Sequence, residues 1–260
     1  MSVLTERERR VAELYGQLHR HADADRATSY VRTGLRLHLH RLGLDPETAL
    51  RGATFLDAGC GGFAGGAMAA ATLGARTVCA VDLSGRNVRA AKARLAGIAR
   101  SLVSRQNLRG LGLATARFDF VFCNGVLHHT EDPPGAFREL VRVLEPGGRV
   151  YVGVYGRGGL YNELCIPTLR LLGRVVPRRA MNVIVRLAPR LLQPSSSLLD
   201  VMYVPIHRHY HRTEVERWCV EAGITPVFLR HYYQPESRVS RLVFGEGSMI
   251  FVSGVKPERA

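Results

Sequence analysis

An acidic residue followed by closely spaced glycines is the clearest chemical feature of the chain. Asp57 comes at the end of an apolar run, and Gly59 and Gly61 follow it with Cys60 between them. Glycines at such a turn let the backbone approach a ligand closely, because no Cβ atom intervenes. Asp82 ends a second apolar run about 20 residues later, where a carboxylate can accept hydrogen bonds from the two hydroxyls of a ribose. The spacing predicts a loop that binds a nucleoside.

The elements that would position these residues follow from the pattern of apolar runs. Between residues 53 and 154, apolar runs alternate with short helical segments. The runs that read as strands are 53–59, 77–82, 101–105, 118–124 and 149–155. Runs that are apolar throughout and separated by helices are typical of a parallel sheet covered on both faces. The fold class predicted from this region is therefore α/β.

The run from Phe55 to Gly62, taken with the run from Val78 to Asp82, resembles motifs I and II of the class I S-adenosylmethionine (SAM)-dependent methyltransferases. The resemblance covers the chain from about residue 51 to 154 and includes the Pro-Gly-Gly turn at 146–148. It implies SAM as the cofactor. It also implies a Rossmann-like, seven-stranded, mostly parallel sheet with one antiparallel strand near the end, flanking helices and a helical cap. SAM carries a sulfonium and an ammonium group and no phosphates, so an acidic residue at the turn suits it.

Carried over by position, the resemblance implies which residues contact each part of the cofactor. Asp57 and the loop with Gly59, Cys60 and Gly61 would contact the methionine part, and Asp82 would hold the ribose. The remaining predicted cofactor residues are Leu83 beside the adenine, Asn107 and Leu108 where the family usually has an aspartate for the adenine amino group, and Asn124 near the methyl group. Phe63 stands where the family commonly has a third glycine, and glycines resume at positions 65 and 66.

The chain is expected to divide into four segments. Residues 1–50 read as an amphipathic helical segment, 51–155 as the SAM-binding core, 156–212 as a helical substrate cap inserted in the fold, and 213–260 as the part that completes the core. Closely spaced prolines are expected to break the cap into short helices. The last segment begins with a predicted helix over residues 212–223, with Thr213 as its N-cap and Gly223 as its end. Strands are predicted at 225–233 and 248–256.

Methyl transfer from SAM needs alignment above all, and it needs a general base where the acceptor must lose a proton. His129, at the predicted edge of the sheet, is the first candidate for this base, and Tyr155 is a second candidate, to position the acceptor. The candidate substrate-binding residues are Tyr161, His207, His209 and Tyr210. The alternatives are that His129 is a polar strand end packed in the core and that the stretch around His207 is an exposed basic turn. The spacing does not predict a metal site.

The formal net charge of +14 admits two interpretations. It could indicate a partner with negative charge: a polyanion such as RNA, an anionic membrane surface or a phosphorylated substrate. Yet only Lys92 and Lys256 among the 36 basic residues are lysines, a skew that is typical of a GC-rich genome. The strand at 118–124 leads into Gly125-Val126 and lacks the Asn/Asp-Pro-Pro-aromatic loop of enzymes that methylate base amines. No appended RNA-binding module is recognisable in the sequence, so nucleic acid is not the expected substrate.

These observations together predict a SAM-dependent methyltransferase that modifies an O, N or C atom of a small molecule, anionic or amphipathic, in specialised metabolism. The alternatives are a methyltransferase of tRNA or rRNA and a non-catalytic partner protein with the same fold. No apolar run reaches the ~20 residues that span a bilayer, and the charged start MSVLTERERR does not resemble a secretory signal. A cytoplasmic location is therefore expected, and a homodimer is left open.

Overall fold

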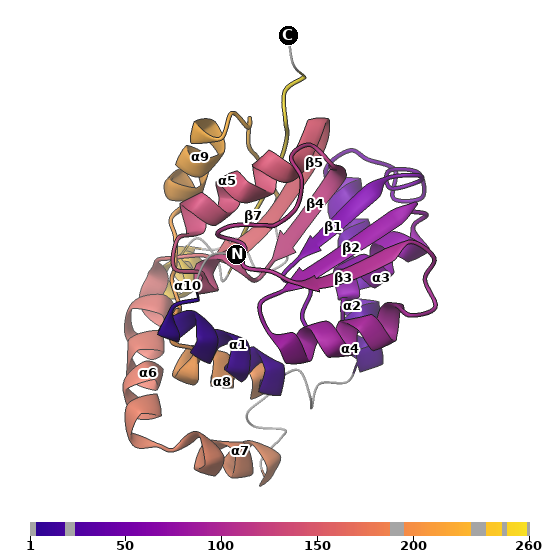
Figure 1. Ribbon diagram of the computed structural model, residues 1–260. Coiled ribbons are helices and arrows are strands. Elements are labelled where there is room, and N and C mark those ends of the chain that lie inside the picture. Colours follow the sequence, from indigo (N-terminus) through magenta and orange to yellow (C-terminus); the bar gives the residue numbers. More distant parts are fainter. Residues whose placement is uncertain (1–3, 19–23, 188–194, 230–237, 246–248, 259–260) are drawn as a thin grey trace.

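The structure is a computed structural model that describes residues 4–18, 24–187, 195–229, 238–245 and 249–258. Its centre is a seven-stranded sheet in the order β3-β2-β1-β4-β5-β7-β6 (Figure 1). The strands are β1 (Thr54–Ala58), β2 (Thr77–Asp82), β3 (Ser101–Arg105), β4 (Phe118–Asn124), β5 (Leu144–Tyr155), β6 (Val227–Leu229) and β7 (Met249–Val255). Neighbouring strands pair in parallel except β7, which runs antiparallel to both β5 and β6. The predicted α/β fold with a mostly parallel seven-stranded sheet is confirmed.

The order of the strands reverses between β1 and β4. The chain builds outward from β1 to β3 and then returns to place β4 on the other side of β1. In open α/β sheets, ligands bind in the crevice at such a reversal, beyond the carboxyl ends of the strands. Asp57, near the end of β1, and Asn124, at the end of β4, therefore lie beside this crevice.

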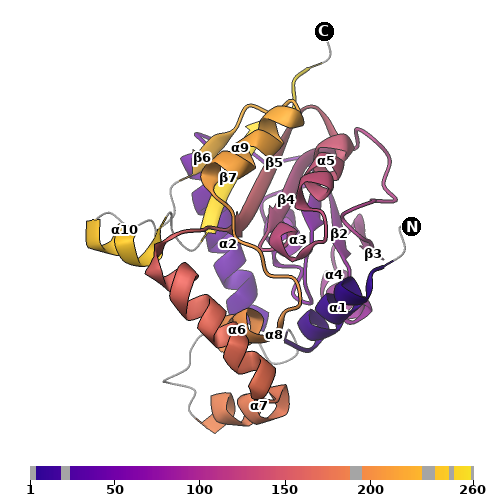
Figure 2. The ribbon, with the colours of Figure 1, turned by 90° about the vertical axis from the view of Figure 1, so that its left-hand side faces the viewer.

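Helices cover both faces of the sheet, as strands with apolar side chains on both sides require (Figures 1 and 2). Phe137 of α5 and Trp218 of α9 join the core with Leu56 on one face. Leu39 of α2 joins the core with Phe55 on the other face, together with α3 and α4. The helices of the core are α2 (Ala24–Arg41), α3 (Gly65–Thr72), α4 (Gly85–Leu95), α5 (Pro133–Val143) and α9 (Arg212–Glu221), with the short turn η1 (Leu127–His129) before α5.

The start of α9 differs from the sequence prediction. The N-cap is His211 and not Thr213, because the side chain of Glu214 accepts a hydrogen bond of 2.7 Å from the His211 backbone N–H and so completes a capping box. The helix ends just before Gly223, which has a φ of 72°, as predicted for its stop. The strand predicted at 225–233 is described only as Val227–Leu229, and its second half lies outside the described residues.

A second, smaller unit of helices lies beside the carboxyl edge of the sheet (Figure 2). Its elements are α1 (Glu6–Leu18), η2 (Tyr161–Cys165), α6 (Ile166–Val175), α7 (Arg178–Leu187) and α8 (Ser195–Tyr203), with α10 (Arg238–Phe244) beside η2. Val11 and Leu14 of α1 share an apolar cluster with Met181, Leu199 and Met202, so the amino-terminal helix packs in the cap while α2 covers the sheet. Among the described residues, no helix combines the length and the apolar character needed to cross a membrane.

Candidate functional site

A pocket of about 250 Å³ opens at the carboxyl edge of the sheet, between the loops after β1, β2 and β4 and the inner face of α1. Every residue that the resemblance assigns to the cofactor lines this pocket, and so does His129. The cofactor residues in question are Asp57, Gly59, Cys60, Gly61, Asp82, Leu83, Asn107, Leu108 and Asn124.

The charge of this pocket is opposite to the charge of the chain. Its lining includes Glu8, Asp57 and Asp82, and the described residues that line it include no lysine or arginine. The whole chain, by contrast, carries a formal net charge of +14. Sites for phosphate groups combine basic side chains with the amino ends of helices. The lining therefore suits a cationic ligand such as a sulfonium nucleoside better than a nicotinamide dinucleotide.

The loop after β1 depends on two glycines. Gly59 and Gly61 have φ angles of 85° and 62°, in a region that residues with a Cβ rarely enter. A Cβ on Gly59 would also collide with the side chain of Val126, which belongs to the loop after β4. The backbone N–H of Gly61 donates to Oδ2 of Asp82 at 2.9 Å and thereby joins the loops after β1 and β2.

The side chain of Asp57 is buried beside the loop after β1. Its Oδ2 accepts a hydrogen bond of 2.8 Å from the backbone N–H of Ala67, at the start of α3. A Cβ on Gly66 would lie 2.8 Å from the carboxyl carbon, so the helix approaches this closely only because residue 66 is glycine. Burial raises the pKa of Asp57 to about 7, although hydrogen bonds from Ala67 and Gly66 oppose the shift. A cation beside Asp57 would favour its ionised form.

Asp82 is held at the pocket wall by three donors. Besides Gly61, the backbone N–H of Ser84 donates to Oδ1 at 2.7 Å and the amide of Asn87 donates to it at 3.1 Å. These bonds fix the direction of the carboxylate before any ligand binds. Such preorganisation lowers the entropic cost of recognising a ribose.

Helix α1 closes the pocket and is anchored through the buried Glu8. The Glu8 carboxylate accepts hydrogen bonds from the Arg109 guanidinium at 2.6 and 2.7 Å and from the Asn107 amide at 3.2 Å. Burial raises the pKa of Glu8, but the hydrogen bonds from Arg109, Thr5 and Asn107 outweigh it and hold the pKa below its usual value. Asn107, assigned to the adenine by resemblance, thus also ties the loop after β3 to α1. Sequence reasoning missed Glu8 because it read residues 1–50 only as an amphipathic helix.

The other end of α1 lies against the loop after β2. A Cβ on Gly16 would lie 2.6 Å from Oγ of Ser84, two residues after Asp82. Only a residue without a side chain allows the helix to approach this closely. The helix therefore contacts the loop after β3 through Glu8 and the loop after β2 through Gly16.

His129 lines the pocket and has both ring nitrogens in contact with neighbours. Nδ1 lies 2.7 Å from the carbonyl oxygen of Ile206, and Nε2 lies 2.7 Å from the hydroxyl of Tyr15. A carbonyl oxygen can only accept, so Nδ1 carries a proton. Burial lowers the pKa of His129 to about 4, although Asp200 and the Ile206 carbonyl oppose the shift. At neutral pH the ring is uncharged, and its lone pair on Nε2 faces Tyr15.

Asp200 of α8 lies behind this pair and accepts from two tyrosines. The hydroxyl of Tyr15 donates to its Oδ1, and the hydroxyl of Tyr155 donates to its Oδ2 at 2.8 Å. Burial opposes the charge of Asp200, but its contacts with His207, His129 and Tyr15 outweigh burial and hold its pKa at about 2. Tyr15 and Asp200 escaped sequence reasoning, because neither lies in a motif and both reach the site through the packing of the cap.

The predicted substrate-binding residues lie outside this pocket. His207 lies 3.5 Å from Asp200 and 3.0 Å from His209, whose other nitrogen contacts the Gly156 carbonyl. Tyr210 packs edge-on against Trp218, with ring centroids 4.6 Å apart, and Tyr161 is exposed on η2. Tyr155 does not line the pocket either. Within the described residues, no three His, Cys, Asp or Glu side chains form a group that could hold a metal ion.

Comparison with known proteins agrees with this geometry. Residues 56–152 match the model of a methyltransferase domain family. A ubiquinone biosynthesis O-methyltransferase from Xanthomonas oryzae is 34% identical over 135 residues, which cover 50% of this chain and 54% of that relative. The chain thus spans about half the length of the first curated relatives that it matches.

Solved structures of low sequence identity share the fold. The YcgJ protein from Bacillus subtilis has a TM-score of 0.56 at 19% identity, covering 85% of this chain and 99% of that one. The magnesium protoporphyrin IX methyltransferase from Synechocystis has a TM-score of 0.52 at 16% identity, covering 88% and 83%. The acidic pocket at the switch between β1 and β4 lies largely within the residues that match a methyltransferase domain.

Proposed function

We propose that the chain binds SAM in the pocket at the carboxyl edge and transfers its methyl group to a hydroxyl oxygen of a small molecule. The observation that carries this proposal is that Asp57 and Asp82 lie at the carboxyl ends of the adjacent parallel strands β1 and β2. The hydrogen bond from the Gly61 N–H to Asp82 joins the loops that follow these strands. The choice of an oxygen acceptor draws on the relatives named ubiquinone biosynthesis O-methyltransferase.

The residues present fit a cationic nucleoside. Asp57 is buried with a raised pKa, and a sulfonium or ammonium group beside it would supply the missing counter-charge. Asp82 has its carboxylate fixed by Gly61, Ser84 and Asn87 at the pocket wall, where a ribose would lie. SAM, when bound, supplies an electrophilic methyl group on a good leaving group. The chain must then align the acceptor and remove its proton.

His129 and Tyr15 are the groups that would take this proton. The Tyr15 hydroxyl contacts both Nε2 of His129 and the carboxylate of Asp200. While His129 is uncharged and Asp200 is ionised, the hydroxyl proton is the only proton shared by these two contacts. One further proton would satisfy both contacts, with His129 charged or Asp200 neutral. The cluster can therefore accept the proton that an acceptor hydroxyl loses, at a place next to the proposed methyl donor.

The distribution of charge favours a small molecule over RNA as the acceptor. The cap arginines that the structure describes lie outside the pocket lining, and Asp57 and Asp82 in the lining would repel a phosphate backbone. An acceptor with an apolar body would find Val11, Ala12 and Val126 on the pocket wall. The prediction of a role in specialised metabolism is part of this proposal.

Two measurements test the proposal. Calorimetry with SAM and with NAD is expected to show binding of SAM alone. Methyl-tritiated SAM, incubated with the protein and either extracts of small molecules or tRNA, is expected to label a small molecule. Label in tRNA would make the chain an RNA methyltransferase, and SAM binding without transfer to either substrate would favour a non-catalytic partner protein. Absence of SAM binding would refute the assignment of the pocket.

A further inference from the structure

Helix α6 is apolar on two opposite faces. On its inner face Ile166 is buried and Leu169 is partly buried in the cap cluster. A Cβ on Gly173 would lie 2.5 Å from the Met202 carbonyl oxygen, so α6 packs tightly on α8. The opposite face carries leucine and valine as well. A helix that is apolar all round normally has both faces covered, in a protein core or by lipid.

The outer face carries a stripe of exposed apolar side chains that Thr168 interrupts. Leu164, Leu171, Leu172 and Val175 follow the helical spacing that places residues on one side. Leu171 and Val175 are 60% and 75% exposed. Val183 and Ile184 of α7, the helix that follows α6, are also exposed. We call these residues the cap stripe: Leu164, Leu171, Leu172, Val175, Val183 and Ile184.

Further exposed apolar side chains lie on the same side of the molecule. Helix α10, which carries the exposed Val239 and Leu242, lies next to η2 at the start of the stripe (Figure 2). Most of the large apolar side chains that are exposed among the described residues belong to η2, α6, α7, α10 or Leu160. A contiguous apolar surface of this kind marks an interaction site, whereas single exposed leucines do not.

Arginines accompany the cap stripe. Residues 156–199 contain seven arginines and no lysine, and Glu163 is the only acidic residue in this range. Arg174 and Arg179, which flank the stripe on α6 and α7, are exposed. A surface that combines exposed leucine and valine with arginine is complementary to a bilayer of anionic lipid, because the apolar side chains enter the acyl boundary while the guanidinium groups meet phosphates.

We propose that the cap stripe, with Arg174 and Arg179, docks the protein reversibly on the surface of an anionic lipid bilayer. The charge composition distinguishes this occupant from a second copy of the chain, because two such faces would bring their arginines together. Helices α5 and α9 lie at the end of the molecule opposite α7, outside the cap stripe (Figure 2). The proposal does not depend on the reaction in the pocket, since binding to vesicles needs neither SAM nor an acceptor.

Co-sedimentation of the full chain with lipid vesicles tests this proposal. Binding to phosphatidylcholine vesicles that contain phosphatidylglycerol is expected to be at least about ten-fold tighter than binding to pure phosphatidylcholine. Added salt is expected to weaken the binding, because it screens the arginines. Equal binding to both kinds of vesicle, or binding to neither, would overturn the proposal.

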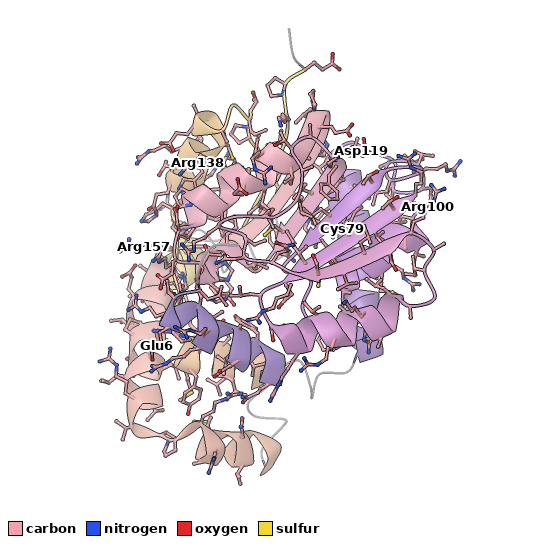
Figure 3. All side chains as sticks on the ribbon, in the orientation of Figure 1. Glu6, Cys79, Arg100, Asp119, Arg138 and Arg157 are labelled. Atoms are coloured by element: carbon pink, nitrogen blue, oxygen red, sulfur yellow. The ribbon has the colours of Figure 1, made fainter. Side chains whose placement is uncertain are left out.

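Two variant pairs locate the surface. Leu171→Ser with Val175→Ser, and separately Arg174→Gln with Arg179→Gln, are each expected to weaken binding by about ten-fold. All four side chains are exposed, so the variants should unfold at the temperature of the parent protein. The matched controls are Val220→Ser on α9, where Val220 is 66% exposed, and Arg138→Gln on α5 (Figure 3). Both controls are expected to bind vesicles as the parent does.

The remaining outcomes contradict the proposal. If the arginine pair abolishes binding and the serine pair does not, the face is a site for soluble polyanions. If the serine pair abolishes a concentration-dependent dimer, seen by light scattering, and vesicle binding is absent, a second copy of the chain covers the stripe. If the Val220→Ser and Arg138→Gln controls lose binding as strongly as the two pairs, the protein binds lipid through no defined face.

Discussion

The hydroxyl of Tyr15 lies 2.7 Å from Nε2 of His129 and at the same time donates to the carboxylate of Asp200. These three residues come from α1, from the turn after β4 and from α8, which are far apart in the sequence. Their meeting brings α1 and α8 together beside His129, at the edge of the proposed SAM pocket. Burial keeps the His129 ring uncharged, and its Nε2 lone pair is directed at the Tyr15 hydroxyl.

Replacing the groups of this cluster should lower turnover and leave SAM binding nearly unchanged. His129→Asn removes the group that accepts the proton, so kcat should fall by roughly a hundredfold or more if the acceptor is a hydroxyl. Tyr15→Phe should lower kcat as well, because the proton then has no path between His129 and Asp200. Calorimetry with SAM and steady-state kinetics separate the two effects. Tyr203→Phe, which removes a cap hydroxyl bound to the Val176 carbonyl, is the matched control.

The rate should depend on pH as expected for a buried histidine. Burial lowers the pKa of His129 to about 4, and the uncharged ring is the form that accepts a proton. With SAM at saturation, kcat is therefore expected to stay level as the pH falls from 7 to about 5 and to decline only as it approaches 4. If the base were a solvent-exposed histidine, the enzyme would lose activity near the ordinary histidine pKa of about 6.5. A decline centred at that higher pH would show that His129 titrates in water and is not the buried base described here.

Asp82→Ala should weaken SAM binding by about 1–3 kcal/mol, because it removes the acceptor for the ribose and leaves the Gly61 and Ser84 N–H groups without a partner. The dissociation constant from calorimetry measures this loss. Asp119→Asn is the control, since Asp119 lies at the opposite edge of the sheet (Figure 3). Unchanged affinity in Asp82→Ala would mean that SAM binds elsewhere.

Gly16→Ala should displace α1 from the pocket. The added Cβ would meet Oγ of Ser84 at 2.6 Å, and such overpacking costs about 1–3 kcal/mol. Both SAM affinity and thermal stability are expected to fall. The second variant Ser84→Ala removes Oγ, so the double variant should recover part of both losses. Equal losses in the single and the double variant would show that the contact between α1 and the loop after β2 does not control closure.

The protein should lose stability as the pH falls below about 6.5. Burial lowers the pKa values of His128 and His129 below that of free histidine, so the unfolded state binds more protons than the folded state in this range. These two histidines then lower the free energy of unfolding as the pH decreases, against an opposite contribution from Asp57, whose pKa is raised on folding. His128→Phe keeps the stacking on Tyr155 and removes one titrating group. The difference between the melting temperatures at pH 7 and pH 5 should therefore shrink in this variant, and an unchanged difference would exclude His128 as a cause.

Local sequence determined the strands of the core and the residues at the ends of them. Asp57 and Asp82 could be placed in one pocket from sequence, because each ends an apolar run and the carboxyl ends of parallel strands share an edge. The turn at Gly59 and Gly61 could be predicted as well, because glycine readily adopts the positive φ angles that such a turn requires. The end of α9 at Gly223 could also be predicted from residue type. The N-cap at His211 depends on a hydrogen bond that the Glu214 side chain accepts, and the sequence placed this N-cap two residues too late, at Thr213.

Tertiary packing alone decided how the pocket is closed and which groups surround His129. Glu8 reaches Arg109, and Tyr15 reaches Asp200, only because α1 docks against the cap and the sheet together. Apolar periodicity predicts that α1 is a helix with one buried face, but it carries no information on which distant residue that face meets, because such contacts depend on the summed packing of the whole chain. The sequence by itself therefore determined the edge of the sheet where a ligand would bind, and the folded cap determined the cluster of Tyr15, His129 and Asp200 beside it.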